Sequence, residues 1–310
     1  YVSNEQTQVY VSGLGENMKE AMKLMESVIS DAQANPEALA GLKADMLKRR
    51  QNNKLNQNAN FSMLRAYNVY GPKSPATNVL SNKEIKNLKN QELLDRIHTL
   101  NSFEHEVLYY GPMSQEEIVA TINEIHNTPA TLTPIVKNES FKERKIEENE
   151  VIIAPYDAKQ IYLAGYSNRG EIYNAENAPI IALYNSYFGG GMNAIVFQEM
   201  REARGLAYSA GAALSSPSKK GKTYNYNMFI ATQNDKMIDA LSAFEEIINN
   251  MPLSEQAFAI AKEAIISRLR SERITKEEVL TYYLDQEELG LTEDTRKQLF
   301  EAVQAMTLDD

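Results

Sequence analysis

The feature that most constrains this chain is an internal repeat with a constant offset. Gly71 and Gly290 lie 219 positions apart (290 − 71 = 219), and apolar residues agree at that offset over about seventy positions. The paired positions include Met18/Met237, Ala21/Ala240, Val28/Ile247 and Ile29/Ile248. Because such a repeat means that one folding unit recurs, we interpret the chain as parts of two similar units. A chance alignment of two unrelated amphipathic helix pairs is the alternative.

Each copy of the repeat carries the pattern of a helix pair. Apolar residues recur at three- and four-residue steps from Asn17 to Ser30, which predicts one amphipathic helix. The segment from Met237 to Ile248 has the same pattern. A proline break follows at Pro36 and at Pro252, and each break precedes a longer helix. The spacing of Thr275 and Glu278 predicts a capping box.

Strand patterns lie among these helices. Alternating or β-branched residues predict strands at 7–12, 104–110, 151–154, 160–166, 206–214 and 224–230. The last two are joined by a lysine- and glycine-containing loop, so we expect them to form a hairpin. Helices are expected at 91–99, 115–126 and 178–188, and a further one through Ala194–Met200 that ends at Gly205. The mixture indicates an α+β fold in which helices pack on one face of antiparallel-rich sheets.

The ends of the two copies differ. Copy one continues beyond Gly71 into a helix and a strand, whereas copy two stops at Thr307–Asp310, where that helix would open. We therefore expect residues 1–132 to be the back half of one domain, 133–149 to be a linker, and 150–310 to be a second domain without its last helix and strand. Since the chain begins at Tyr1, we expect a mature form or an excised fragment.

Composition excludes several functional classes. Forty-two acidic residues against 32 Lys and Arg give a net charge of −10, which argues against nucleic-acid binding despite a basic run in residues 43–54. No stretch approaches the ~18 consecutive apolar residues of a membrane span. The absence of cysteine excludes disulfides, thiol nucleophiles and cysteine-bound zinc.

Two short motifs have weak functional readings. Gly189–Gly191 precede a helix, but the Lys-Ser/Thr of a phosphate-binding loop is absent, so a tight turn between two helices is the better interpretation. His105-Glu106 resembles the start of a zinc motif, yet the second histidine is missing. His98, His105 and His126 show no ligand spacing, and we expect no metal ligands within this chain.

The run from Phe188 to Ser209 resembles the pitrilysin/insulinase-type zinc peptidases, or inverzincins. It contains the Gly-rich turn and then Arg201-Glu-Ala-Arg-Gly-Leu-Ala-Tyr208, which leads into the expected hairpin. The resemblance extends over essentially all 310 residues, because the repeat and its helix pairs fit the same family. It implies two tandem, structurally similar domains from a clamshell that closes around a peptide substrate.

The resemblance also implies a division of the active site. No H-x-x-E-H motif occurs here, so the zinc ion would be bound by a domain or subunit outside this chain. Arg201 and Tyr208, seven positions apart, match the family residues that bind substrate and stabilise the tetrahedral intermediate. The fragment alone is then expected to be inactive and to need a metal-bearing N-terminal half or partner subunit. From the bare residues, a surface arginine and a tyrosine packed in a strand remain the alternative.

Two further functions stay open. The chain could be a non-catalytic binding or scaffold member of the same family, because such members position a partner or a substrate. It could also be an unrelated α+β protein that binds a peptide or ligand. The resemblance implies the bacterial periplasm or cell envelope as its location.

Overall fold

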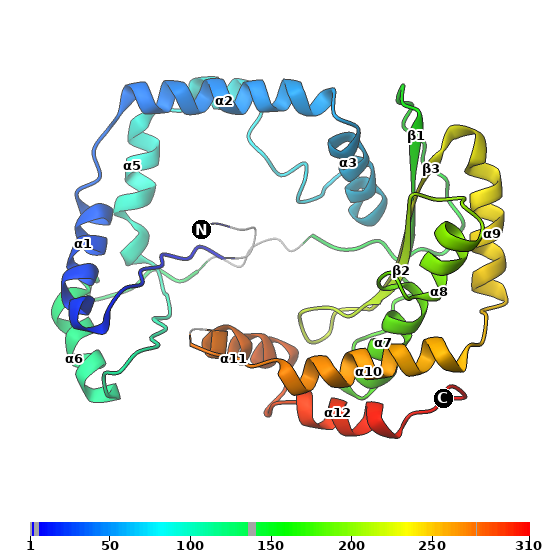
Figure 1. The fold of residues 1–310 in the computed structure, drawn as a ribbon. Coiled ribbons are helices and arrows are strands. Elements are labelled where there is room, and N and C mark those ends of the chain that lie inside the picture. The colour runs from blue at the N-terminus through cyan, green and yellow to red at the C-terminus, as the bar shows by residue number, and fades with distance from the viewer. Residues whose placement is uncertain (1, 3–5, 136–140, 277) are drawn as a thin grey trace. The chain divides into compact units, whose positions relative to one another are not determined.

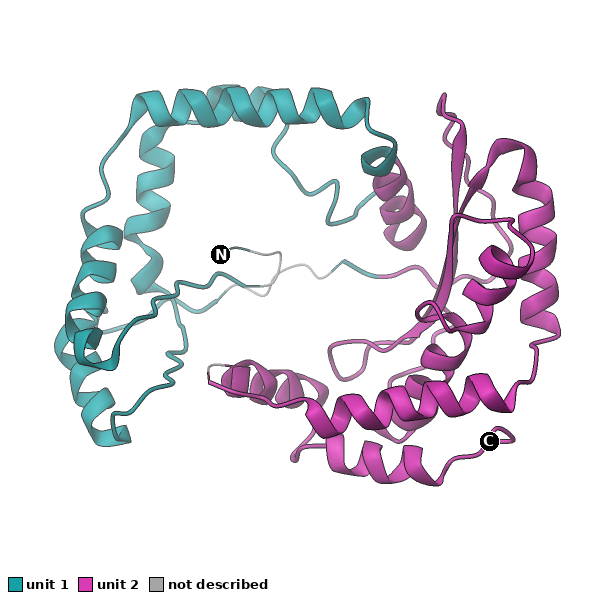
Figure 2. Ribbon diagram, viewed as in Figure 1, with its two compact units in different colours: residues 1–60, 72–142 teal, residues 61–71, 143–310 magenta. Residues whose placement is uncertain are grey.

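The computed structural model describes residues 2, 6–135, 141–276 and 278–310. The chain divides into two compact units, drawn in different colours in Figure 2. Unit 1 comprises residues 1–60 and 72–142, and unit 2 comprises residues 61–71 and 143–310. The fold combines helices with a small antiparallel sheet, so the expected α+β class is confirmed.

Unit 1 is helical in its regular structure. Its elements are η1 (Gly15–Asn17), α1 (Met18–Ser30), α2 (Pro36–Lys54), α4 (Asn82–Asn87), α5 (Asn90–His98), η2 (Leu100–Ser102) and α6 (Gln115–Ile125). Polar caps set several of the starts: the Asn35 side chain accepts from Ala38 N, and Ser114 forms a capping box with Glu117. Helix α1 packs against α5 and α6. The buried apolar residues of these helices are Met22, Ile29, Leu39, Ile85, Ile118 and Ile125.

Unit 2 contains the sheet and the remaining helices (Figure 1). The strands are β1 (Gln160–Ser167), β2 (Ser209–Ser215) and β3 (Asn225–Gln233). The helices are η3 (Ala175–Asn177), α7 (Ala178–Tyr184), η4 (Asn185–Gly189), α8 (Ile195–Phe197), η5 (Gln198–Ala203), η6 (Asn234–Lys236), α9 (Met237–Asn249), α10 (Glu255–Ser271), α11 (Glu278–Leu289) and α12 (Arg296–Ala305). Most of α3 (Gln57–Tyr70) also belongs to unit 2. Both η4 and η5 are π-helical.

The sheet has the order β1-β3-β2 and is antiparallel throughout. Leu163 and Ala210 both pair with Ile230, so the three side chains share one face. That face packs into the core with residues of α7–α10, including Phe188, Val196 and Met200. The opposite face meets α3, where the Phe61 ring lies 5.5 Å from Tyr162 and 6.1 Å from Phe229. Helices therefore cover both faces of this sheet (Figure 1), so the expectation that helices pack on one face only was wrong.

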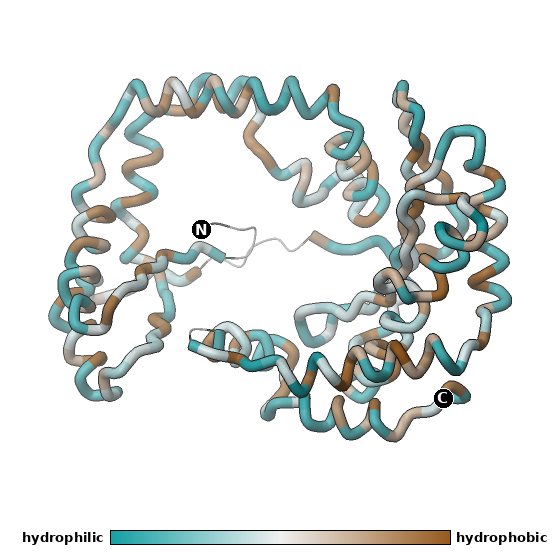
Figure 3. Tube along the Cα trace, in the orientation of Figure 1, coloured by the Kyte–Doolittle hydropathy of each residue, from teal (hydrophilic) through white to brown (hydrophobic). Residues whose placement is uncertain are grey.

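Helix α10 contributes apolar residues to the core of unit 2. Figure 3 shows hydrophobic and hydrophilic positions alternating along α10, and the residues that α10 buries are Phe258, Ala261, Ile265 and Ile266. Ser254 caps this helix by accepting from Ala257 N at 3.2 Å. Among the described residues, no helix is both long and apolar enough to cross a membrane.

Element bounds recur along the chain at the offset of the sequence repeat. Helices α1 and α9 both have 13 residues and begin at Met18 and Met237, and α2 and α10 begin at Pro36 and Glu255. The short turns η1 and η6 begin at Gly15 and Asn234. Gly71 and Gly290 end helices in the left-handed region, with φ of 76° and 74°. Each of these helix starts and terminal glycines is 219 positions from its counterpart.

Three expected strands are not regular strands. Residues 7–12, 104–110 and 151–154 have extended or irregular backbone, and within the described residues only the isolated bridges Val2–Thr7 and Phe103–Thr133 touch or adjoin them. A local alternating pattern cannot show whether a neighbour is present to take up the N–H and C=O groups of a strand. The expected linker, 133–149, includes residues 136–140, which lie outside the described residues. Later in it, Arg144 N donates to Val69 O at 2.8 Å.

Candidate functional site

The candidate site begins with the helix that carries Arg201. Here α8 runs directly into the π-helical η5, and Met200 on its buried side is fully enclosed by the core. Gly205 closes the helix at φ +57°, a conformation that glycine adopts without the strain of a side chain. The backbone N–H groups of Leu206 and Ala207 then both donate to Met200 O, at 2.8 and 3.2 Å. This cap turns the chain sharply from the helix into the sheet.

Tyr208 stands at the junction between that cap and β2. Its N–H donates to Ala231 O at 2.8 Å, which fixes the backbone at the end of β3. The side chain is 69% exposed. The phenol is therefore open to solvent and is not packed within the sheet.

Arg201 lies close to two aromatic rings. Its Cζ is 5.0 Å from the centroid of the Phe197 ring and 5.5 Å from that of Tyr208. A guanidinium within about 6 Å of an aromatic face is attracted by the ring quadrupole. Stacking leaves the edge of the guanidinium, where its N–H donors lie, open to other groups. The Arg201 side chain is 44% exposed, and its Nε lies 3.5 Å from Oε1 of the neighbouring Glu202.

The neighbouring Arg204 has a different environment. Its Nη1 lies 2.7 Å from Glu246 Oε2 and its Nε 3.4 Å from Glu199 Oε2, so it ties η5 to α9. The hydrogen bond with Glu246 raises the pKa of Arg204 and lowers the pKa of Glu246. Two arginines three positions apart are thus distinguished: Arg204 is held by carboxylates, whereas Arg201 rests on aromatic rings.

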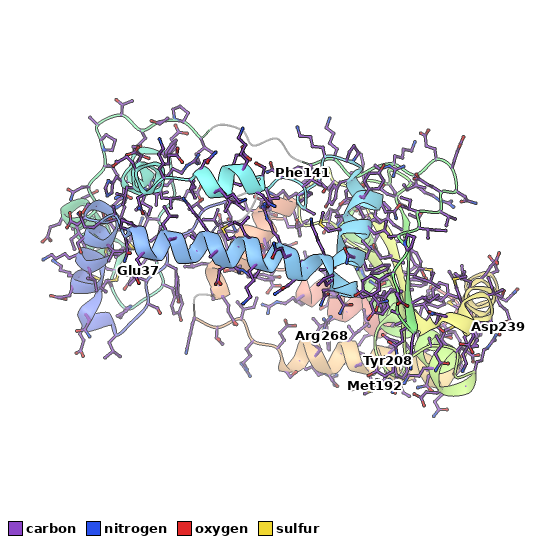
Figure 4. The ribbon with its side chains drawn as sticks, turned by 90° about the horizontal axis from the view of Figure 1, so that it is seen from above. Glu37, Phe141, Met192, Tyr208, Asp239 and Arg268 are labelled. Carbon is purple, nitrogen blue, oxygen red and sulfur yellow. The ribbon has the colours of Figure 1, made fainter. Side chains whose placement is uncertain are left out.

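An exposed apolar side chain borders the same helix. Met192 is 72% exposed, and its carbonyl accepts from Gln198 Nε2 at 2.5 Å. Figure 4 labels Met192 and Tyr208 on this part of unit 2. The region offers a cation, a phenol and an apolar side chain to solvent. This combination can donate hydrogen bonds to peptide carbonyls and contact an apolar side chain.

The three glycines before α8 form a turn between helices, as expected. Gly190 N donates to Asn185 O at 2.7 Å and closes η4. A Cβ on Gly189 would lie 1.8 Å from Ala212 O, so this residue must lack a side chain for η4 to pack against β2. The function of this glycine is close packing of helix on sheet.

Two of the histidines form a cluster with a glutamate that the sequence analysis did not predict. His105 Nε2 lies 2.8 Å from His126 Nε2, and His126 Nδ1 lies 2.7 Å from Glu26 Oε1. No motif spacing could signal this contact, because the three residues come from separate segments of unit 1. Two nitrogens bound to one tetrahedral zinc ion would lie about 3.3 Å apart, so these atoms do not fit a shared metal. The described residues contain no group of three or more His, Cys, Asp or Glu suited to a metal ion.

Comparison with known proteins was made on both sequence and structure. A family model described as the peptidase M16 inactive domain matches residues 87–265. No curated protein sequence matches the chain.

Several solved structures share the fold. A crystal structure of a peptidase M16 inactive domain from Pseudomonas fluorescens has a TM-score of 0.61 at 18% identity, over 95% of this chain and 70% of that one. The periplasmic protease PqqL from Escherichia coli has a TM-score of 0.66 at 12% identity, over 94% of this chain. The ferredoxin protease FusC, solved in complex with Arabidopsis ferredoxin, has a TM-score of 0.63 at 12% identity, over 95% of this chain.

The chain spans only part of the longer relatives, 33% of PqqL and 32% of FusC. At these identities the structural likeness establishes the fold. The family model, however, matches more than half of the chain. The chain therefore belongs to the M16 peptidase family, in the part described as its inactive domain.

Proposed function

We propose that this chain supplies the non-metal wall of a zinc peptidase's substrate site. Arg201 would hold a peptide carbonyl of the substrate, and Tyr208 would stabilise the tetrahedral intermediate. The observation that carries the proposal is the exposed Arg201–Tyr208 stack at the junction of η5 and β2. The substrate would be a peptide or an unfolded segment. The zinc would be bound by a metal-bearing N-terminal half or a partner subunit, since the described residues here do not fit it.

The tandem repeat supports this assignment. We infer from the matching starts of α1 and α9, and of α2 and α10, that the chain contains parts of two duplicated domains. Under this proposal residues 1–132 are the back half of one domain, 133–149 the linker and 150–310 the second. The second domain carries both proposed site residues.

The chemistry of the two side chains suits these roles. During hydrolysis of a peptide bond, negative charge develops on the carbonyl oxygen of the substrate. The Tyr208 hydroxyl is a donor that can meet this oxygen without first breaking a buried contact. Arg201 is held by ring stacking, and its N–H groups can hold an adjacent backbone carbonyl and so fix the register of the peptide.

The test compares conservative variants in the complete protein or complex. Tyr208→Phe removes one donor and is expected to lower kcat by about 10²–10³, while Arg201→Lys should raise KM for peptides. Tyr283→Phe is a matched control, since Tyr283 is also exposed in unit 2, and Arg270→Lys removes a guanidinium that stacks on Phe300. Undiminished turnover by the Tyr208→Phe variant would refute the role of the phenol.

A non-catalytic role is the second candidate, and the description of the matched family as an inactive domain favours it. The same surface would then bind a peptide or partner without supporting cleavage. The fluorescence anisotropy of a dye-labelled unfolded peptide would report this binding. Binding that depends on Arg201, together with no restoration of cleavage by any metal-bearing half, would select the scaffold role. We propose the bacterial periplasm or cell envelope as its location, and the fold shared with a periplasmic protease supports this proposal.

A further inference from the structure

Charge is distributed unevenly along the chain, and one stretch of it is strongly basic. Residues 43–96 contain eleven Lys and Arg but only four Asp and Glu, which gives a net charge of +7 (11 − 4 = 7). The whole chain carries −10, so the remaining residues carry −17 (−10 − 7 = −17). Residues 43–60 and 72–96 of this stretch belong to unit 1. A charge asymmetry of this size within one chain indicates an interaction surface.

Helix α4 is the centre of this basic stretch. Helix α2 packs against α4, and two of its cations are tied there: Lys43 Nζ donates to Lys86 O at 3.1 Å, and Arg50 Nη1 donates to Asn82 Oδ1 at 2.8 Å. Arg50 Nη2 also donates to Leu80 O at 2.5 Å. These bonds hold the two helices together, so the cations around α4 are presented by a preformed surface. We define the basic surface as Lys43, Arg50, Lys83, Lys86, Lys89 and Arg96.

The positive charge of the basic surface has no carboxylate partner within the part of the chain that the structure describes. None of its six cations forms an ion pair there, and the four from Lys83 onward are exposed. The carboxylates on α4 and α5 have other partners. Glu84 Oε2 accepts from Ser81 N at 2.7 Å, and Glu92 Oε2 accepts from Lys89 N at 3.3 Å, so both cap helix starts. The cations are therefore available to a partner of opposite charge.

An open hollow lies within the basic surface. It has a volume of about 630 Å³, and its lining includes the cations Lys83 and Arg96 together with Leu80 and Leu88. Leu80 is 44% exposed, and its neighbour Val79 is 61% exposed. Because leucines and cations line the same hollow, it can take an apolar side chain while the cations contact carboxylates on either side of it.

We propose that the basic surface binds an acidic polypeptide segment, with an apolar residue of that segment seated in the hollow. Charge complementarity selects this partner, because unpaired exposed cations favour a chain of carboxylates and disfavour basic or neutral segments. The surface lies in unit 1, whereas Arg201 and Tyr208 belong to unit 2. The inference is therefore independent of the proposed peptidase role, and either can fail without the other.

Nucleic acids and anionic membranes match the charge of this surface but not its surroundings. Residues 43–60 and 72–98 contain no Phe, Tyr or Trp on which a base could stack. A nucleic acid or a membrane also extends well beyond the basic surface, where the remaining charge of −17 repels it. A short acidic segment contacts the basic surface alone. The sequence and the charge distribution therefore favour a polypeptide.

The unmodified chain provides the first test. The probe is a short dye-labelled peptide of Asp and Glu with one central Leu, and its binding is followed by fluorescence anisotropy. We expect saturable binding at low salt that is lost near 1 M salt, where the screening length falls to about 3 Å. A peptide with Asn and Gln in place of the acidic residues should not bind, and one with Ser in place of Leu should bind more weakly.

Three results on the unmodified chain would overturn the proposal. The first is the absence of saturable binding of the acidic peptide at low salt. The second is equal affinity for the Leu and Ser peptides, which would refute the role of the hollow. The third is tighter binding of a single-stranded DNA of equal charge, or of phosphatidylserine vesicles, which would refute the choice of a polypeptide.

Variants provide the second test. Lys83→Gln, Lys86→Gln and Arg96→Gln are combined in one chain, since all three side chains are exposed. Each exposed ion pair contributes about 1.4- to 5-fold to affinity, so the triple variant should bind the acidic peptide about 3- to 100-fold more weakly. If the triple variant does not fold, as judged by circular dichroism, the peptide comparisons on the unmodified chain still decide the outcome.

The matched control removes the same charge from unit 2. It also replaces two lysines and one arginine that are exposed, and consists of Lys145→Gln, Arg273→Gln and Lys297→Gln. Its affinity for the acidic peptide should stay within about twofold of the wild type. Equal losses in the two triple variants would show that the peptide responds only to the net charge of the chain, and would refute a localised surface.

Discussion

Gly189→Ala tests how the candidate site is held in place. An added Cβ would lie 1.8 Å from Ala212 O, 2.5 Å from its carbonyl carbon and 2.7 Å from its nitrogen, whereas real Cβ contacts essentially never fall under 3.0 Å. The π-helix η4 and strand β2 would have to separate by more than about 1 Å, and neither contact atom belongs to a flexible side chain. Overpacking of a core costs typically 1–3 kcal/mol, and a clash with backbone belongs at or above the upper end of that range.

The consequence is measurable as a loss of thermal stability. For a unit of this size, each kcal/mol corresponds to about 2–4 °C, so the Gly189→Ala variant should lose roughly 6–12 °C in the Tm of unit 2. Circular dichroism and tyrosine fluorescence both follow this transition. Because β2 begins next to Tyr208, the separation should also weaken the peptide binding that we propose for Arg201 and Tyr208.

The same substitution elsewhere gives the control. Gly41 lies within α2 and has nothing within 4 Å of an added Cβ, so Gly41→Ala should stabilise unit 1 by about 0.5–1 kcal/mol. A Gly189→Ala variant within 1 kcal/mol of the wild type would refute the packing argument. It would mean that η4 can move away from β2 at little cost.

Two further predictions concern the helices of unit 2. Ser254→Ala removes the cap of α10 and should cost about 1 kcal/mol by urea unfolding, and an unchanged unfolding midpoint would show that water replaces the cap. The Arg296 side chain lowers the pKa of Asp294. A depressed pKa means that the stabilisation is present above about pH 4 and lost as the pH falls through the folded pKa. Asp294→Asn should therefore lower the Tm near neutral pH, by an amount worth at most about 1 kcal/mol for this partly exposed pair, and have no effect at the lowest accessible pH. An equal loss at all pH values would contradict an ionic origin.

Periodicity and capping predicted the helices well. The helix expected over 17–30 is α1, and Gly205, where a helix was expected to end, has the left-handed φ of 57°. These features depend on residues within one or two turns of each other, so local sequence contains the information.

The π-helical geometry and the ring stack needed the structure. Local periodicity predicted a plain helix from Ala194 to Met200, whereas the chain forms α8 and then η5. The aromatic face under Arg201 combines Phe197 from the helix with Tyr208 from beyond the cap. The wider turn of a π-helix depends on how the segment packs on the core. A segment this short has no periodic sequence pattern that distinguishes it from an α-helix.

The sequence by itself determined the helices, their caps, the 219-residue periodicity and the motif that contains Arg201 and Tyr208. Tertiary structure alone decided which extended segments became strands, because pairing requires a neighbour that can be far away in the chain. It also decided that Glu26 meets His126, 100 positions later, and that Gly189 lies against the backbone of β2. Such contacts arise from the packing of whole elements, and no spacing along the chain encodes them.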